Sequence, residues 1–118
     1  MQYLLMIYGE EKLEAKMSDS DRGKMMADYG AFTKQIIASG HYKGGNPLQP
    51  IATATTVRVR EGKTVTTHGP FAETREQLGG YYLVEAKDLD EATALAARIP
   101  SSKFGSIEVR PVMVIPGM

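Results

Sequence analysis

The chain contains no cysteine, and this absence excludes disulfide bonds, thiolate catalysis and zinc–thiolate sites. It also fits a protein of the reducing cytosol. An excess of charge is missing as well, because 14 basic residues balance 14 acidic ones. A balanced surface exerts no long-range attraction on phosphate backbones or anionic lipids. We therefore expect neither nucleic acid nor membrane among the partners.

Long hydrophobic runs are also absent. The apolar start, Tyr3 to Tyr8, lacks a basic leader, is too short for a signal peptide and runs straight into Glu10 and Glu11. No run approaches the roughly 20 apolar residues that a membrane span requires. These observations predict a cytoplasmic protein whose 118 residues form one domain, 1–118.

Apolar spacing divides the chain into strands and helices. Strands are expected at Tyr3–Tyr8, at Thr53–Arg60 and Lys63–Thr67 as a hairpin turning at Glu61-Gly62, at Tyr81–Ala86, and from Ile107 to Arg110. One helix begins near Ser18 and ends at Gly40, with a stripe of Met25, Tyr29, Phe32 and Ile36 widened by Met26, Thr33 and Ile37. A second helix is capped by Asp88, buries Ala92, Leu95, Ala96 and Ile99, and ends at Pro100.

The order of these elements, β-α-β-β-β-α-β, predicts the α+β class. It matches a ferredoxin-like βαββαβ unit with an added hairpin. Pro111 confines the last strand to an edge or a bulge. Right-handed crossovers place both helices on one face of the sheet and leave the other face uncovered.

The first strand presents apolar side chains on both faces. Tyr3, Leu5 and Ile7 alternate with Leu4, Met6 and Tyr8, and the helices can bury only one of the two sets. An uncovered apolar face marks a partner site. A second copy of the sheet is the simplest cover, so we expect a face-to-face homodimer; cover by the chain's own loops is the alternative.

The segment from His68 to Tyr82 is the most unusual connection in the chain. It combines glycines, a proline, a titratable imidazole and carboxylates between two strands, which a plain turn does not require. Pro70 is placed to start a short helix that Gly79 or Gly80 ends, with Glu73 and Glu76 on one face. A histidine near carboxylates can serve as a general acid or base. In the alternative interpretation the two glutamates are solvated and Arg75 neutralises them.

His41, the second histidine, follows Gly40, and we expect the glycine-rich stretch from His41 to Leu48 to be a loop. Two roles stay open for it: a hydrogen bond to a ligand or partner, or a cap on the preceding helix. The two histidines are far apart in the sequence and neither has a carboxylate at ligand spacing, so we expect no metal. No cofactor is expected either.

Several segments together resemble the YCII-related family, of the DGPF-domain type. They include Gly40-His41-Tyr42, Thr53 to Arg58, His68-Gly69-Pro70-Phe71-Ala72-Glu73, Glu76 to Tyr82, and Glu108 to Met113. The resemblance implies a dimeric α+β barrel of ferredoxin-like subunits. The resemblance also implies a possible role for the chain. In family members a histidine and an aspartate suggest an enzymatic activity, and some DGPF proteins are connected with transcription initiation. Position 68 departs from the motif, because histidine stands where the family has aspartate.

These observations lead to two functional hypotheses. In the first, a homodimer binds a small organic molecule in a cleft, with acid–base chemistry. His68 would be acid or base, Glu73 its orienting partner and His41 a further polar contact. Gly69, Pro70, Phe71, Glu76, Tyr81 and Tyr82 would line the ligand site. In the second, the chain is a non-catalytic regulatory module that docks onto a protein such as a transcription factor.

Overall fold

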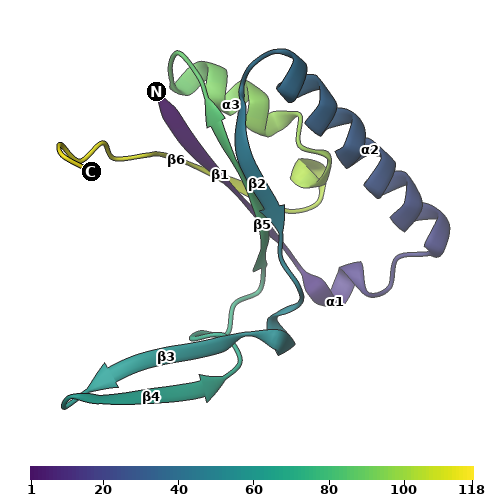
Figure 1. Cartoon of the computed structure of the whole chain (residues 1–118). Coiled ribbons are helices and arrows are strands. Elements are labelled where there is room, and N and C mark those ends of the chain that lie inside the picture. The colour runs from purple at the N-terminus through teal and green to yellow at the C-terminus, as the bar shows by residue number, and fades with distance from the viewer.

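The computed structural model describes residues 1–118 and contains a four-stranded sheet and a separate two-stranded hairpin (Figure 1). The sheet strands are β1 (Gln2–Gly9), β2 (Tyr42–Pro47), β5 (Gln77–Glu85) and β6 (Ser106–Pro111). The hairpin consists of β3 (Thr55–Arg60) and β4 (Lys63–His68). The helices are α1 (Glu11–Glu14), α2 (Asp19–Ala38) and α3 (Leu89–Ala97), with short 3-10 turns η1 (Ile51–Thr53) and η2 (Pro100–Lys103).

The sheet order is β2-β5-β1-β6, and every neighbouring pair is antiparallel. This is the order of a ferredoxin-like βαββαβ unit, with β3 and β4 inserted between its second and third strands. The predicted α+β class is confirmed. β6 lies at an edge of the sheet, as its terminal Pro111 requires.

Both long helices begin where the sequence predicts, and α2 also ends as predicted, whereas α3 ends at Ala97, before Ile99 and Pro100. The Ser18 hydroxyl accepts from the Asp21 N–H at the start of α2, and the Asp88 carboxylate accepts from the Glu91 N–H at the start of α3. At the end of α2, Gly40 takes a left-handed φ of 81°, and the His41 N–H donates to the Ile36 carbonyl. This pattern is a Schellman motif.

The core lies between the sheet and the pair α2 and α3, which cover the same face (Figure 1). It is built from Tyr3, Leu5, Phe32, Ile36, Tyr82, Val84, Ala86, Ala92, Leu95, Ala96 and Ile99. The predicted stripe of α3 is therefore confirmed, and that of α2 is confirmed only in part. Phe32 and Ile36 are buried, whereas Met26 and Ile37 are 71% and 54% exposed. The stripe is narrower than predicted because only one row of α2 faces the sheet.

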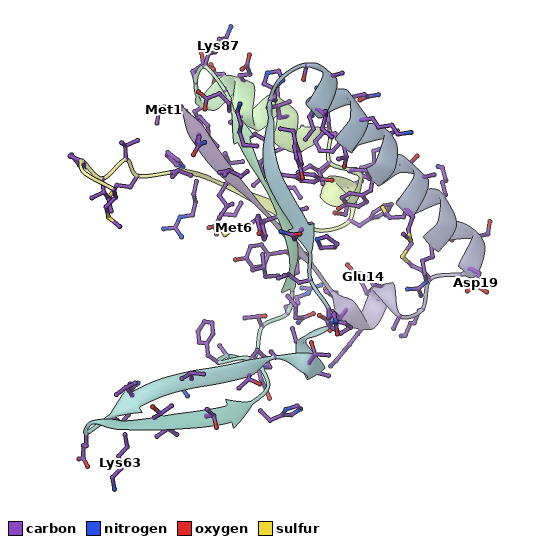
Figure 2. All side chains as sticks on the ribbon, in the orientation of Figure 1. Met1, Met6, Glu14, Asp19, Lys63 and Lys87 are labelled. Carbon is purple, nitrogen blue, oxygen red and sulfur yellow. The ribbon has the colours of Figure 1, made fainter.

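The opposite face of the sheet carries no helix. Since Tyr3 and Leu5 point into the core, the alternation of a strand sends Leu4 and Met6 the other way. Figure 2 shows Met6 on the side away from the helices. Leu4 pairs with Leu83 of β5, and Met6 pairs with Tyr81. We call these four residues the open face.

Two parts of the sequence prediction are wrong. The polar segment Tyr42–Pro47 is not a loop but β2, an edge strand that pairs with β5. Its glycine-rich sequence has no apolar alternation, so the periodicity gave no signal. Gly45 allows close packing instead, because a Cβ there would lie 2.8 Å from the Tyr81 carbonyl oxygen.

The second error concerns the segment after Pro70. No helix forms there, and β5 begins at Gln77 rather than at Tyr81. Gly79 and Gly80 do not end a helix but lie inside this strand. Gly79 is the extra residue of a β-bulge, because Ile7 pairs with Gly80 and Tyr8 pairs with Leu78.

Candidate functional site

The molecule has a groove on the helix-covered side of the sheet, with a volume of about 850 Å³. α1, α2 and η2 contribute most of its lining. We call it the helix-side groove. Its apolar lining includes Leu13, Met17, Met25 and Phe104. Its charged lining includes Glu14, Asp21, Asp28, Lys24, Lys103 and Arg98.

Two glycines form part of the floor of the groove. Gly105 packs directly on the backbone of Tyr8, so that a Cβ there would overlap the Tyr8 carbonyl oxygen. Gly9 lies under the Glu14 side chain, and a Cβ at Gly9 would lie 2.5 Å from Glu14 Oε1. The absence of side chains at these positions allows the end of β1 to approach both η2 and the carboxyl group of Glu14.

Glu14 has a perturbed environment. Partial burial raises the pKa of its carboxyl, the negative charge of Glu11 raises it further, and the nearby Arg22 guanidinium opposes both. The Glu14 carbonyl accepts a hydrogen bond of 3.2 Å from Arg22 Nη2, which ties the end of α1 to the start of α2. A carboxyl with a raised pKa at the edge of this groove keeps its proton to a higher pH than a fully exposed carboxyl does.

A tyrosine–serine pair connects α2 to η2 at the same place. The Tyr29 hydroxyl is hydrogen-bonded to Ser101 Oγ. Burial raises the pKa of Tyr29; the Ser101 hydrogen bond lowers it, and the charges of Tyr82 and Glu14 raise it. The phenol therefore stays protonated at neutral pH and can act only as a hydrogen-bond donor or acceptor there.

Phe32 and Arg98 also line the groove. The Phe32 ring is 3% exposed and meets the Tyr82 ring edge-on, with 5.3 Å between centroids. The Arg98 guanidinium lies 5.6 Å from the Phe32 centroid and also donates to Gln35 Oε1 at 3.0 Å. These contacts fix a cation at the rim of an apolar pocket.

The structure places His68 at the end of β4, outside the groove and exposed to solvent. It pairs with Thr55 across the hairpin, and Gly69 then turns the chain with a φ of 100°. Pro70 and Phe71 follow, and Phe71 is 79% exposed. These residues form an exposed connection rather than a lined pocket.

In the charged part of this loop, Arg75 is held by Glu10, which the sequence prediction did not assign to the site. Arg75 Nε donates to Glu10 Oε1 at 2.7 Å, and this contact raises the pKa of Arg75. Arg75 therefore makes its direct ion pair with Glu10; the charge of Glu76 also raises the pKa of Arg75, and Glu73 makes no ion pair with it. Glu73 is exposed, and it makes no hydrogen bond or ion pair with His68.

The two tyrosines at 81 and 82 lie on opposite faces of β5. Tyr81 belongs to the open face, where its hydroxyl accepts from Asn46 Nδ2 at 2.9 Å. Tyr82 is a core residue whose hydroxyl is 2.7 Å from Thr33 Oγ1. The proposed role of Tyr82 as a wall of the loop site is therefore wrong, because consecutive strand residues point in opposite directions.

His41 is placed between α2 and α3, at the start of β2, whereas the hairpin with His68 follows the other end of that strand. Its Nδ1 is 2.6 Å from Ser39 Oγ, and its Nε2 is 3.2 Å from Glu91 Oε1. These contacts link the end of one helix to the start of the other. The imidazole contacts side chains and not the last carbonyls of α2, so it does not form the helix cap that was considered, and it lies apart from His68 and from the groove.

A comparison with protein families gives a match over residues 1–116 to the YCII-related domain. The chain belongs to the YCII-related family. An uncharacterized protein of Rhizobium meliloti (strain 1021) is 34% identical over 114 residues, which is 95% of this chain and 92% of the relative.

The YCII-related chain also resembles a solved enzyme structure. This is the 5-chloro-2-hydroxyhydroquinone dehydrochlorinase TftG from Burkholderia phenoliruptrix AC1100, in complex with 2,5-dihydroxybenzoquinone. The TM-score is 0.54 at 16% identity, and the match covers 96% of this chain and 94% of TftG. The likeness shows a shared fold.

The residues of this YCII-related groove were not identified from the sequence. Glu14 lies in a polar stretch without a motif, and its pKa depends on burial against segments distant in sequence. Tyr29 was assigned only to a core stripe, and Ser101 was not considered. The sequence did contain one signal for a close approach at this place: Gly9 ends one strand and Gly105 precedes another.

Proposed function

We propose that this YCII-related protein binds a small organic molecule in the helix-side groove and exchanges a proton with it through Glu14. The observation that carries the proposal is a carboxyl group of raised pKa at the edge of a cavity of about 850 Å³. Ligand pockets typically enclose about 300–1,000 Å³ and combine apolar walls with a few polar groups. The groove has both properties.

The lining indicates a class of ligand. Leu13, Met17, Met25 and Phe104 offer contacts to a flat apolar ring. Arg98, Lys24 and Lys103 offer hydrogen bonds and charge to hydroxyl or carboxylate substituents. A hydroxylated aromatic ring fits this combination, and TftG, which has the same fold, was solved with 2,5-dihydroxybenzoquinone. In such a complex Glu14 would donate a proton to a ring oxygen, or accept one from it.

The binding test uses 2,5-dihydroxybenzoquinone and a series of hydroxybenzoates, titrated into ¹⁵N-labelled protein. We expect amide shifts to concentrate in α1, α2 and η2. The variant Glu14→Gln should lose the pH dependence of binding, while Glu61→Gln, in the exposed hairpin turn, should bind as the parent protein does. Shifts confined to other regions would refute the groove as the ligand site.

We further propose that two copies associate through their open faces. Leu4, Met6, Tyr81 and Leu83 form an apolar surface on the side of the sheet without helices. Apolar sheet faces are normally covered, and a two-fold copy is the simplest cover. In sedimentation at micromolar concentration the parent protein should be a dimer. Leu83→Lys should be a monomer, and Ala38→Lys on the exposed side of α2 should leave the dimer intact. A lone 12.9 kDa particle would contradict the proposal.

In this proposed dimer, the loop that begins at His68 is a second region that could contact a ligand. It lies outside the groove, so a ligand contact by His68, Gly69, Pro70, Phe71, Glu73 or Glu76 would require the space between the stacked subunits. His68→Ala and Glu73→Ala test this directly. If both variants bind every ligand with unchanged affinity, the loop has no role in binding.

A further inference from the structure

The β3–β4 hairpin is an arm that its own subunit does not cover. β3 and β4 pair with each other and with no strand of the main sheet, and Figure 1 shows the hairpin projecting from the end of the sheet. Figure 2 places Lys63 at its tip. An isolated two-stranded hairpin is at best marginally stable in water. A hairpin of six paired residues on each strand therefore requires a surface to pack against.

One face of the arm is suited to such a contact. Val57 and Val59 are 60% and 61% exposed, and their cross-strand neighbours are Thr66 and Thr64. The face is thus made of β-branched side chains without a formal charge. The basic residues Arg58 and Arg60 alternate with the valines and so point to the other face.

The amount of exposed surface supports an assembly. A compact protein of 12.9 kDa exposes about 6,300 Å², whereas this chain exposes 8618 Å². The difference, about 2,300 Å², exceeds the roughly 800 Å² that each partner buries in an interface of standard size. The radius of gyration is 16.4 Å, against about 13.5 Å for a compact chain of this length.

The direction of the projecting segments favours a second copy of the chain as the occupant. The arm and the C-terminal segment 112–118 both extend on the side of the sheet away from the helices (Figure 1). That segment carries Met113 and Val114, which are 81% and 87% exposed. The open face and the two apolar projections that flank it therefore belong to one continuous side of the molecule. A two-fold copy seated there covers all three in both subunits at once.

We infer that the arm of each subunit packs through Val57 and Val59 against a second copy of this chain. The inference rests on the proposed dimer and adds the arm to its interface. The arm then holds the subunits together from the edge of the stacked sheets. It also carries the His68 loop at its base to the space between the subunits.

A mixed dimer gives a direct test. Chains with ¹³C-labelled valine methyl groups are combined with unlabelled chains, and isotope-filtered NMR selects contacts between the two. We expect contacts from the Val57 and Val59 methyl groups to protons of the unlabelled chain. A dimer in which these methyl groups show no such contact would overturn the arm inference alone, whereas a chain that is monomeric at all concentrations would overturn the proposed dimer as well.

A pair of variants gives the energetic test. Val57→Thr combined with Val59→Thr keeps the β-branched shape and should weaken dimerisation by about tenfold or more, because two valine side chains lose their burial. Val65→Thr, on the opposite face of the arm, is the matched control and should leave the dissociation constant within about threefold. Circular dichroism confirms that each variant folds. Equal effects of the two changes would contradict the inference.

Discussion

Phe32 connects the stability of the fold to the helix-side groove, and the substitution Phe32→Leu isolates what its ring contributes. The ring is buried, meets Tyr82 edge-on at 5.3 Å and lies 5.6 Å from the Arg98 guanidinium. Leucine keeps an apolar side chain at this position but removes both ring interactions. The edge-on pair contributes about 0.5–1.5 kcal/mol. A cation–π contact near the surface contributes about 0.5–1 kcal/mol.

The expected destabilisation is therefore about 1–2.5 kcal/mol, which corresponds to a fall in Tm of about 4–10 °C for a domain of this size. Urea unfolding followed by circular dichroism measures it. Phe104→Leu is the control, because Phe104 also lines the groove but is 76% exposed, and its replacement should change stability by less than about 0.5 kcal/mol. A double-mutant cycle with Arg98→Met separates the cation–π part. Equal stability of Phe32→Leu and the parent protein would refute the packing described here.

Three further outcomes are expected. Because the folded-state pKa of Glu14 lies above its unfolded value of 4.5, the stability it contributes is complete below that value and is lost as pH rises through the folded pKa. The free energy of unfolding, measured with urea across this pH range, should therefore fall less with rising pH in Glu14→Gln than in the parent protein. Identical pH profiles of the two proteins would contradict the raised pKa. Gly105→Ala should cost about 1–3 kcal/mol in urea unfolding, because its methyl group overlaps the Tyr8 carbonyl; an unchanged midpoint would contradict this contact. Asp88→Ala removes the cap that accepts from the Glu91 N–H at 2.9 Å and should cost about 1 kcal/mol, a loss that Asp88→Asn should largely restore.

The elements that the sequence predicts well are those with strong local signals. Helix caps at Ser18 and Asp88 and the left-handed Gly40 depend on a few neighbouring residues, so the spacing alone indicates them. The hairpin turn at Glu61-Gly62 is of the same kind, with φ values of 52° and 75°. The uncovered face of the sheet also followed from the sequence, since β1 is apolar on both sides.

The site was predicted less well, for physical reasons. The sequence emphasises chemically unusual stretches, and the loop at His68 is the most unusual of these. Its residues are nevertheless exposed and spread along an extended connection. Glu14 has no local signature, because the largest cause of its raised pKa is burial, which only the folded chain creates; Glu11 raises the pKa further and Arg22 lowers it. β2 was missed for a similar reason, since Gly45 fits a close contact with β5 and the strand has no apolar periodicity.

A crystal structure of the protein soaked with 2,5-dihydroxybenzoquinone tests the ligand site most directly. We predict density for the ring between α1, α2 and η2, with one ring oxygen within hydrogen-bond distance of the Glu14 carboxyl. Density between two stacked subunits beside His68, with the helix-side groove empty, would contradict this assignment.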